Sequence, residues 1–415
     1  MAKELLIIYQ KSNYRWYILA LAMLSYGTIA GLQRMCLPVL FKEISTELNL
    51  NLVSIGTIWG LDPLAGVFIG LPSGLLADRF GVKRSLVAIC ILAGMIGSLR
   101  AFSVNFLTLA LSTLVFGFVS AATVSTTVKA AGVWFRPRQL GLANALLQIS
   151  WFGCAMIATM LSATVLSPSL GGWRQVILLF SGPPVLVGLL WLITGREPVK
   201  GQPAATSVSD IPFRQSLSRV IHIREVWIIG LIQIAIFGTH TGLMGYLPLY
   251  LRNIGWSTVG ADSAITVLNG ACLLGIIPMV LLANRLGSQK GMLIFSVSII
   301  SVSMLLLPFV QGSLVYVLLF VSGFLRSAAM PLLSTLLFNT RGVGATYGGT
   351  AIGLASAMGM VGSFLAPPLG ASFTFISQSM PFIFWGILPA IALPLFWFIK
   401  EDRNRKLSGE RGFEL

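Results

Sequence analysis

The sequence predicts an all-α membrane protein in which twelve transmembrane helices form two pseudo-symmetric six-helix bundles. Three observations lead to this fold class. First, 56% of the 415 residues are hydrophobic, 10% are charged and the mean hydropathy is +0.87, so the chain is far more apolar than a soluble protein of this size. Second, apolar segments long enough to cross a hydrocarbon core of ~30 Å recur along the whole chain. Third, the two halves of the sequence resemble each other.

The individual spans follow from the apolar segments, since a membrane-crossing helix needs about 20 such residues. The first segment begins after the charged stretch that ends at Arg15 and is longer than the apolar region of a signal peptide. We therefore expect it to be a retained helix. The twelve expected helices cover residues 15–41, 51–77, 85–103, 106–135, 139–166, 174–195, 226–251, 261–284, 291–311, 313–338, 344–372 and 380–399.

Residues 196–225 interrupt this pattern with a polar and basic segment that contains Pro and Gly. This composition predicts a cytoplasmic linker between an N-terminal bundle (residues 1–195) and a C-terminal bundle (residues 226–400). Within the linker, apolar residues near helical spacing over 213–223 predict a short helix on the membrane surface. Residues 401–415 are expected to form a cytoplasmic tail.

The internal repeat relates the halves at a shift of about 206 to 211 residues. Gly31 of the first expected helix recurs as Gly242 of the seventh, and LLADRFG at 75–81 recurs as LLANRLG at 281–287. A two-fold repeat of six helices places a binding site near the bilayer midplane, and the halves can rock around it. This is the architecture of a transporter.

The basic residues are placed unevenly, although the net charge of +15 alone would also be compatible with nucleic-acid binding. If the amino terminus is inside, 21 of the 28 Lys and Arg residues lie in cytoplasmic segments, which is the positive-inside distribution. This predicts cytoplasmic termini and no nucleic-acid partner. Three basic residues then lie outside (Lys42, Arg174, Arg252) and four within helices (Arg34, Arg100, Lys129, Arg326), with Arg100 expected at the outer interface.

The loop between the second and third expected helices, GLLADRFGVKR at 74–84, resembles the G-x-x-x-D-R-x-G-R-K motif of the major facilitator superfamily. The resemblance implies alternating access around a cavity lined by the first, fourth, seventh and tenth helices, with this loop as a cytoplasmic gate latch. A helix cap that only fixes topology is the alternative role. The expected gating residues are Asp78, Arg79, Gly81, Lys83 and Arg84, with Asn284 and Arg285 in the second half.

A narrower resemblance is to the anion:cation symporter branch of this superfamily, which carries D-R-x-N-L in its first helix. Here the corresponding residues are Gln33-Arg34-Met35-Cys36-Leu37. The branch pattern around the fourth and fifth helices is matched by Gly117, Ala121, Lys129-Ala130, Trp134-Phe135 and Arg138. Gln33 and Ser120 stand where the branch has acidic residues, so proton coupling through these two positions is not expected.

Arg34 needs a partner, because an arginine at the bilayer centre costs roughly 2.5 to 3.5 kcal/mol on insertion scales. At 1.5 Å per residue, Arg34 lies about 28 Å along the first helix and Asp62 about 24 Å along the second. The two residues are therefore level on neighbouring helices, and we predict that Asp62 forms a charge pair with Arg34. Snorkelling of Arg34 to the outer headgroups is the alternative.

Arg326 lies far from both ends of the tenth expected helix and is predicted to bind substrate, with a structural charge pair as the alternative. His240 lies near the middle of the seventh helix and serves either as a binding residue or as a core residue. We expect the remaining substrate contacts from Gln33, Ser120, Tyr246, Tyr250 and Tyr347.

Two deep arginines give the expected cavity a positive charge, and a guanidinium fork suits a carboxylate. The resulting hypothesis is a monomeric carrier of a small organic carboxylate in the inner membrane of a microbe, working by exchange or facilitated transport. The alternatives are a nitrate-like permease, a proton-coupled symporter using Asp62 or His240, a drug exporter and a non-transporting receptor. No cofactor or metal site is expected, because the four cysteines lack metal-ligand spacing and no nucleophile or phosphate-loop pattern occurs.

Overall fold

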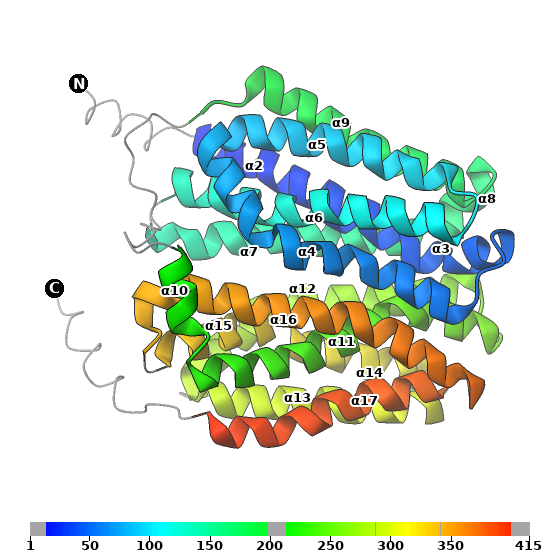
Figure 1. The fold of residues 1–415 in the computed structure, drawn as a ribbon. Helices are drawn as coiled ribbons and strands as arrows, with labels where there is room; N and C mark the ends of the chain where they lie inside the picture. The colour runs from blue at the N-terminus through cyan, green and yellow to red at the C-terminus, as the bar shows by residue number, and fades with distance from the viewer. Residues whose placement is uncertain (1–13, 136, 198–212, 287, 341, 400–415) are drawn as a thin grey trace.

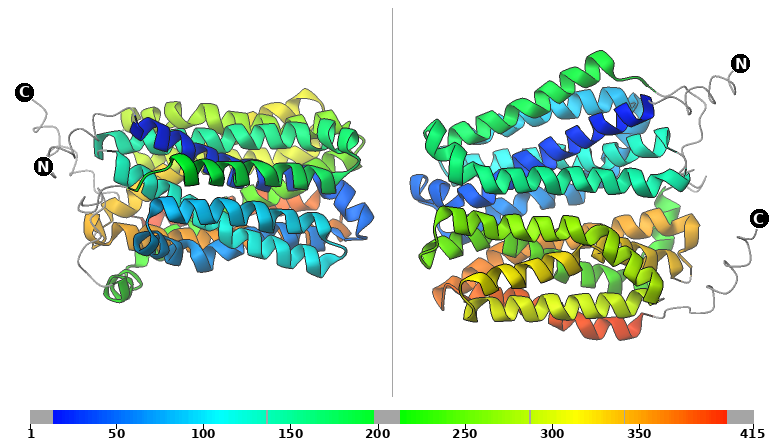
Figure 2. Two further views of the ribbon diagram at one scale, coloured as in Figure 1. Left: turned by 90° about the horizontal axis from the view of Figure 1, so that it is seen from above. Right: turned by 180° about the vertical axis from the view of Figure 1, so that it is seen from behind.

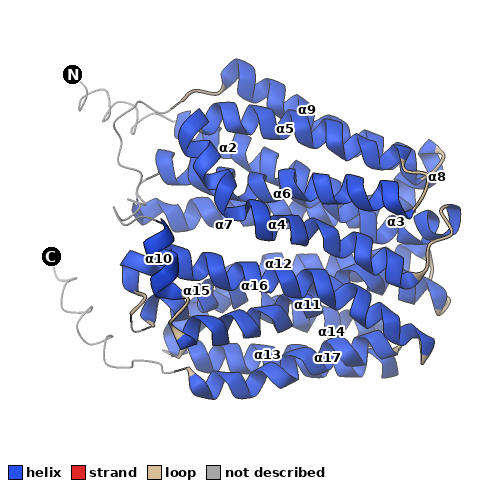
Figure 3. Ribbon diagram, viewed as in Figure 1, coloured by secondary structure: helices blue, strands red, loops and turns tan. Residues whose placement is uncertain are grey.

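The computed structural model describes residues 14–135, 137–197, 213–286, 288–340 and 342–399. These residues form helices and short connections without any strand (Figure 3). Within these described ranges, twelve helical segments are long and apolar enough to cross a membrane, which confirms the predicted fold class. The expected tail at 401–415 and the linker residues 198–212 lie outside the described residues.

The N-terminal six spans are built from α-helices joined by short π and 3-10 segments. The first span is a composite of α2 (Tyr14–Tyr26), the π-helical segment η1 (Gly27–Gln33) and α3 (Arg34–Glu47). The others are α4 (Leu52–Phe80), α5 (Val82–Leu99) with η2 (Arg100–Phe102), α6 (Phe106–Trp134), α7 (Pro137–Leu161) with η3 (Ser162–Leu166) and α8 (Ser167–Leu170), and α9 (Trp173–Thr194).

The C-terminal six spans follow the short helix α10 (Phe213–Val220), which the sequence predicted within the linker. They are α11 (Arg224–Asn253), α12 (Thr258–Leu286), α13 (Gln289–Leu306) with η4 (Leu307–Phe309), α14 (Ser313–Arg326) with α15 (Ala329–Asn339), α16 (Gly344–Ser372) with η5 (Phe373–Phe375), and α17 (Met380–Ala392) with η6 (Leu393–Phe398). The tenth expected helix is thus divided in two after Arg326.

The helices of the two sequence halves gather into two bundles that lie side by side along their length (Figures 1 and 2). α4 packs against α16 and α7 packs against α12 across the boundary between the bundles. Gly60 allows α4 to lie close to α16. A Cβ at this position would lie 2.5 Å from the Phe364 carbonyl oxygen. Small residues at such contacts are typical of helix packing in membranes.

The outer surface of the two bundles is strongly apolar. Large side chains on different helices are more than half exposed, among them Phe68, Met95, Leu107 and Ile193. Their exposure is expected for side chains that contact lipid. We call the end at which α2 begins and α10 lies the terminal end, and the end at which α3 is followed by α4 the distal end (Figure 1).

Candidate functional site

A cavity of about 230 Å³ lies between the two bundles. Both bundles contribute to it, as the internal repeat predicts. The N-terminal bundle supplies Tyr26, Ala30, Arg34, Met35, Trp59, Asp62, Pro63, Gly66, Ser120, Ala121, Val124 and Trp151, and the C-terminal bundle supplies Phe237, His240, Thr241, Met244, Arg326, Met330, Met360 and Ser363.

Arg34 enters this cavity at an irregular point of the first span. It is the first residue of α3, directly after the π-helical turns of η1, and such segments are frequent at functional sites. The predicted charge pair is present, since Arg34 Nε lies 3.1 Å from Asp62 Oδ1. The guanidinium also lies over the Trp59 ring, 5.4 Å from its centroid, which is a cation–π arrangement. Trp59 and Asp62 therefore fix the Arg34 head group in the cavity wall.

Arg326 enters from the opposite bundle, also where a helix is interrupted. It is the last residue of α14, and the chain makes a turn at Ser327 before α15 begins at Ala329. Discontinuous helices of this kind are typical of substrate sites in transporters. The Arg326 Nε is buried without a hydrogen-bond partner among the described residues. Arg326 is thus a cation with a donor group for which no described residue supplies the acceptor.

His240 and Ser120 also line the cavity, as predicted. His240 is half-buried on α11 and lies within electrostatic range of both Arg326 and Arg34. The cavity therefore gathers two guanidinium groups, one carboxylate and one imidazole. Because the fixed charges sum to a positive value, the cavity favours an anion.

Four of the predicted substrate contacts do not line this cavity and lie in other parts of the structure. Gln33 is fully buried, and its amide nitrogen donates to the Ala93 carbonyl at 3.1 Å and to Ser181 Oγ at 3.0 Å. Tyr347 is partly buried and packs against an apolar core of the C-terminal bundle.

Tyr246 and Tyr250 belong to an aromatic cluster with Phe382 and Trp385 at the distal end of the C-terminal bundle. Their hydroxyl groups contact the Gln378 carbonyl at 3.0 Å and Ser379 Oγ at 3.2 Å. Both tyrosines therefore support the packing of α11 on α17.

The expected gate loop is described in part. Gly81 has a φ of +87°, which favours glycine, and the Glu197 carboxylate lies against it. The same carboxylate accepts a hydrogen bond from the Arg84 backbone nitrogen at 3.2 Å, so it caps the start of α5. Arg79 is exposed with its guanidinium over the Phe80 ring, and Lys83 and Arg285 lie near the terminal ends of α5 and α12. The side chains of Asp78 and Asn284 lie outside the described residues.

Two charged residues have a more internal position than the sequence indicated. Arg100, expected at the outer interface, is fully buried in η2, where its guanidinium lies 4.0 Å from the Phe116 ring centroid. Arg252, counted as an outer loop residue, is only 8% exposed and forms an ion pair with the fully buried Asp262. No signal of sequence alone separates these arginines from lipid-facing ones near a helix end.

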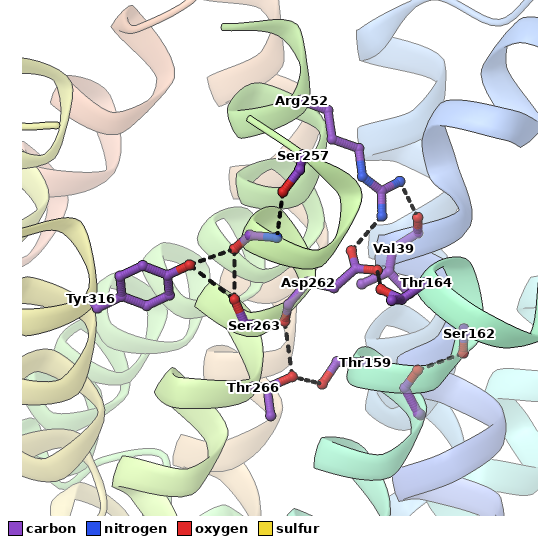
Figure 4. A network of polar contacts seen from close by, with 12 residues as sticks. Val39, Thr159, Ser162, Thr164, Arg252, Ser257, Asp262, Ser263, Thr266 and Tyr316 are labelled. Atoms are coloured by element: carbon purple, nitrogen blue, oxygen red, sulfur yellow. Dashed lines mark hydrogen bonds and ion pairs between the residues drawn. The ribbon is translucent and has the colours of Figure 1, made fainter. Parts of the chain in front are cut away.

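The Arg252–Asp262 pair of the C-terminal bundle is linked to the N-terminal bundle by hydrogen bonds at the distal end (Figure 4). Arg252 Nη1 donates to the Val39 carbonyl at 2.6 Å, and Thr164 Oγ1 donates to Asp262 Oδ2 at 2.8 Å. A further contact joins the Thr159 and Thr266 hydroxyl groups at 3.0 Å. Toward the cavity, Trp59 Nε1 donates across the boundary to the Thr241 carbonyl at 2.8 Å. The structure is therefore closed at its distal end.

Twelve spanning helices, a two-fold bundle arrangement and a charged cavity at the boundary define a membrane transporter. A family model described as Major Facilitator Superfamily matches residues 23–340 and, in a second match, residues 261–414. The chain belongs to the Major Facilitator Superfamily.

Similar proteins are transporters of anions by their names. The probable galactarate/D-glucarate transporter GudP of Bacillus subtilis (strain 168) is 28% identical over 205 residues, which cover 46% of this chain and 43% of that protein. The probable nitrate/nitrite antiporter NarK1 of Thermus thermophilus is 26% identical over 371 residues, with 80% of each chain covered. The hexuronate transporter of Escherichia coli (strain K12) is 22% identical over 262 residues, covering 60% of this chain and 56% of that one.

Solved structures support the same fold. A bacterial homolog of the human lysosomal transporter Spinster, in an inward-facing and unoccupied conformation, superposes with a TM-score of 0.74. The superposition covers 94% of this chain and 97% of that chain at 15% sequence identity. At this identity the likeness is one of fold.

Proposed function

We propose that this protein carries a small anion, most of all an organic carboxylate, across the cytoplasmic membrane by alternating access. The observation that carries the proposal is the presence of two arginines from opposite bundles in one cavity. Each of them follows or precedes an interruption of its helix, as in substrate sites built from discontinuous helices. A carboxylate bound by both guanidinium groups would join the two bundles.

The chemistry and size of the cavity favour such a substrate. A guanidinium presents two parallel donors that match the two oxygens of a carboxylate, and a Lys ammonium group lacks this match. The cavity of about 230 Å³ is smaller than the roughly 300–1,000 Å³ of pockets for drug-sized ligands. These features argue against a drug exporter and support a compact anionic substrate.

The similar proteins point in the same direction, because their names specify galactarate, D-glucarate, hexuronate, nitrate or nitrite. A sugar acid is our first candidate, with hydroxyl groups that could bond Ser120 and Ser363 in the cavity wall. Nitrate is the second candidate, because the nitrate/nitrite antiporter aligns with 80% of this chain.

Exchange or facilitated transport is the mode of transport that we propose. Gln33 and Ser120 cannot titrate, and the Gln33 amide is held by its own hydrogen bonds to Ala93 and Ser181. Asp62 is engaged in an ion pair, because its Oδ1 lies 3.1 Å from Arg34 Nε. Proton-coupled symport would require Asp62 or His240 to titrate during the cycle.

We place the terminal end of the molecule in the cytoplasm because basic residues concentrate there. The closed distal end then faces the external side. We infer that this conformation exchanges substrate with the cytoplasm. The charged residues at the terminal ends of α4, α5 and α12, including Arg79, Lys83 and Arg285, are the proposed latch of the cytoplasmic gate. We propose that Asp78 and Asn284 also belong to this latch.

The test measures thermal unfolding of the purified protein with D-glucarate, D-glucuronate and nitrate. A ligand at 100 times its Kd stabilises the folded state by about 2.7 kcal/mol, so the preferred anion should raise the melting temperature. Arg326→Ala should abolish the rise and Arg174→Ala should leave it intact, because Arg174 pairs with Glu47 at the distal surface. A full rise in the Arg326→Ala protein would refute the site.

Exchange is tested in proteoliposomes loaded with unlabelled D-glucarate. Labelled D-glucarate should accumulate in the loaded vesicles and not in empty vesicles that carry an inward proton gradient. Concentrative uptake into the empty vesicles, lost in Asp62→Asn or His240→Ala, would assign proton coupling to that residue.

A further inference from the structure

Arg100 is a third arginine in the interior of the N-terminal bundle, next to the proposed site. Its Nη2 donates to the Gln33 carbonyl at 3.1 Å, one residue before Arg34, and its Nε donates to the Gly97 carbonyl at 3.3 Å. The guanidinium also lies over the Phe116 ring. These contacts are with neutral groups, and Arg100 Nη1 is buried without a hydrogen-bond partner among the described residues.

Asp62 is a carboxylate in the same part of the N-terminal bundle as this arginine. Its backbone packs against Gly117, where a Cβ would lie 2.7 Å from the Asp62 carbonyl oxygen, and Gly117 directly follows the Phe116 ring that Arg100 covers. Asp62 lies within electrostatic range of both Arg34 and Arg100. Its Oδ1 faces Arg34, and its Oδ2 is buried without a hydrogen-bond partner among the described residues.

Arg34, Arg100 and Asp62 therefore form a cluster with two cations and only one anion. A buried arginine without a counter-charge is strongly unfavourable, so Arg100 and Arg34 are both stabilised by an ionised Asp62. With the cavity empty, the cluster carries one net positive charge. A monovalent anion on Arg34 would make the cluster neutral, provided that Asp62 remains ionised.

We propose that Arg100 is a positioning residue that receives Asp62 when an anion occupies Arg34. The carboxylate turns from Arg34 toward the free Nη1 of Arg100, and no proton is taken up. This inference rests on the proposed anion transport and extends it, because it explains how substrate displaces Asp62 without coupling transport to protons. The switch lies inside one bundle, so it does not require the bundles to move.

The first test uses no substrate and is therefore independent of the proposed function. Arg34→Met mimics the displacement of Asp62 from Arg34. Infrared difference spectra against the matching Asp62→Asn protein report the C=O stretch of a protonated Asp62. At pH 7 we expect no such band in Arg34→Met, because Arg100 holds the carboxylate ionised. We expect the band in Arg34→Met/Arg100→Met, because a buried carboxyl without a cation favours its neutral form.

A protonated Asp62 in Arg34→Met, or an ionised one in the folded double variant, would overturn the proposal. If the double variant does not purify as a monodisperse protein, Arg34→Met decides alone, and Arg34→Met/Arg100→Lys should match it because the charge is kept. Arg34→Met/Arg174→Met is the matched control, since Arg174 lies at the distal surface beside Glu47.

The second test measures the pH dependence of the Kd for D-glucarate. In Arg100→Met, binding should become tighter by close to tenfold per unit of decreasing pH in the range where Asp62 takes up a proton. This added slope, relative to the unaltered protein, should vanish in Arg100→Met/Asp62→Asn. An unchanged slope in a folded Arg100→Met protein that still binds D-glucarate would contradict the switch. Absence of D-glucarate binding to the unaltered protein would refute the substrate proposal and leave the infrared result to decide the switch.

Discussion

The distal closure can be weakened by removing one oxygen atom. Thr164→Val keeps the side-chain shape but loses the hydrogen bond of 2.8 Å that Thr164 Oγ1 donates across the bundle boundary to Asp262 Oδ2. Asp262 is fully buried in the closed conformation, so its oxygen would be left without this donor. In a distal-open conformation water reaches the same oxygen. The substitution therefore destabilises the closed state relative to the open one.

The expected size of this effect follows from the charge on Asp262. A hydrogen bond to a charged group contributes roughly 1.5–3 kcal/mol, and each 1.4 kcal/mol is a factor of ten in an equilibrium. Thr164→Val should shift the ratio of distal-open to distal-closed molecules by about ten- to a hundredfold. A distal-open population of about 1% would then rise to between about 10% and 50%.

Electron–electron double resonance measures the two populations directly. Spin labels at Ser169 and Asn253, which are exposed at the distal ends of the two bundles, report the distance between them. The four native cysteines are replaced by alanine in this background. Thr46→Val is the matched control, because the Thr46 hydroxyl bonds only the Lys42 carbonyl of its own helix in the described structure. Equal distance distributions for Thr164→Val and Thr46→Val would refute the assigned role of the Thr164 bond.

Three further predictions concern other positions. Gly60→Ala should destabilise the closed packing by roughly 1–3 kcal/mol, measured as a lower melting temperature, because its Cβ would meet the Phe364 carbonyl oxygen. Gln33→Glu should lower the melting temperature, because a carboxylate cannot donate to the Ala93 carbonyl. Transport by this variant should remain independent of a proton gradient. Glu197→Gln should reduce stability by about 0.3–1 kcal/mol at low salt, through loss of negative charge at the start of α5, and an unchanged denaturation midpoint would contradict the cap.

The fold was predictable because each span requires a long apolar segment, which hydropathy detects directly. The Arg34–Asp62 pair was also predictable, since the rise per residue places the two side chains at one level of neighbouring helices. The pair could be predicted without knowing how each helix is rotated, because opposite charges inside a membrane usually form ion pairs.

The rotation of each helix about its own axis could not be predicted from the sequence. Helices such as α11 are buried on most sides, so apolar periodicity does not identify the side that faces the cavity. His240 faces the cavity, whereas Tyr246 and Tyr250 face α17. The distal pair was missed for a related reason. Arg252 follows an apolar span as any outer loop residue would, and only the arrangement of the bundles brings it to Val39 and Asp262.

The two halves treat their cavity arginines differently, and this difference bears on the mode of transport. Arg34 has the Asp62 carboxylate beside it, whereas no described carboxylate lies within ion-pair distance of Arg326. When the cavity closes on both sides without substrate, Arg326 must be buried without a counter-charge, which is unfavourable by several kcal/mol. A bound anion supplies the missing charge and removes this barrier. We therefore infer that the return of the empty carrier is the slow step, and that anion exchange is faster than net transport for this arrangement of charges.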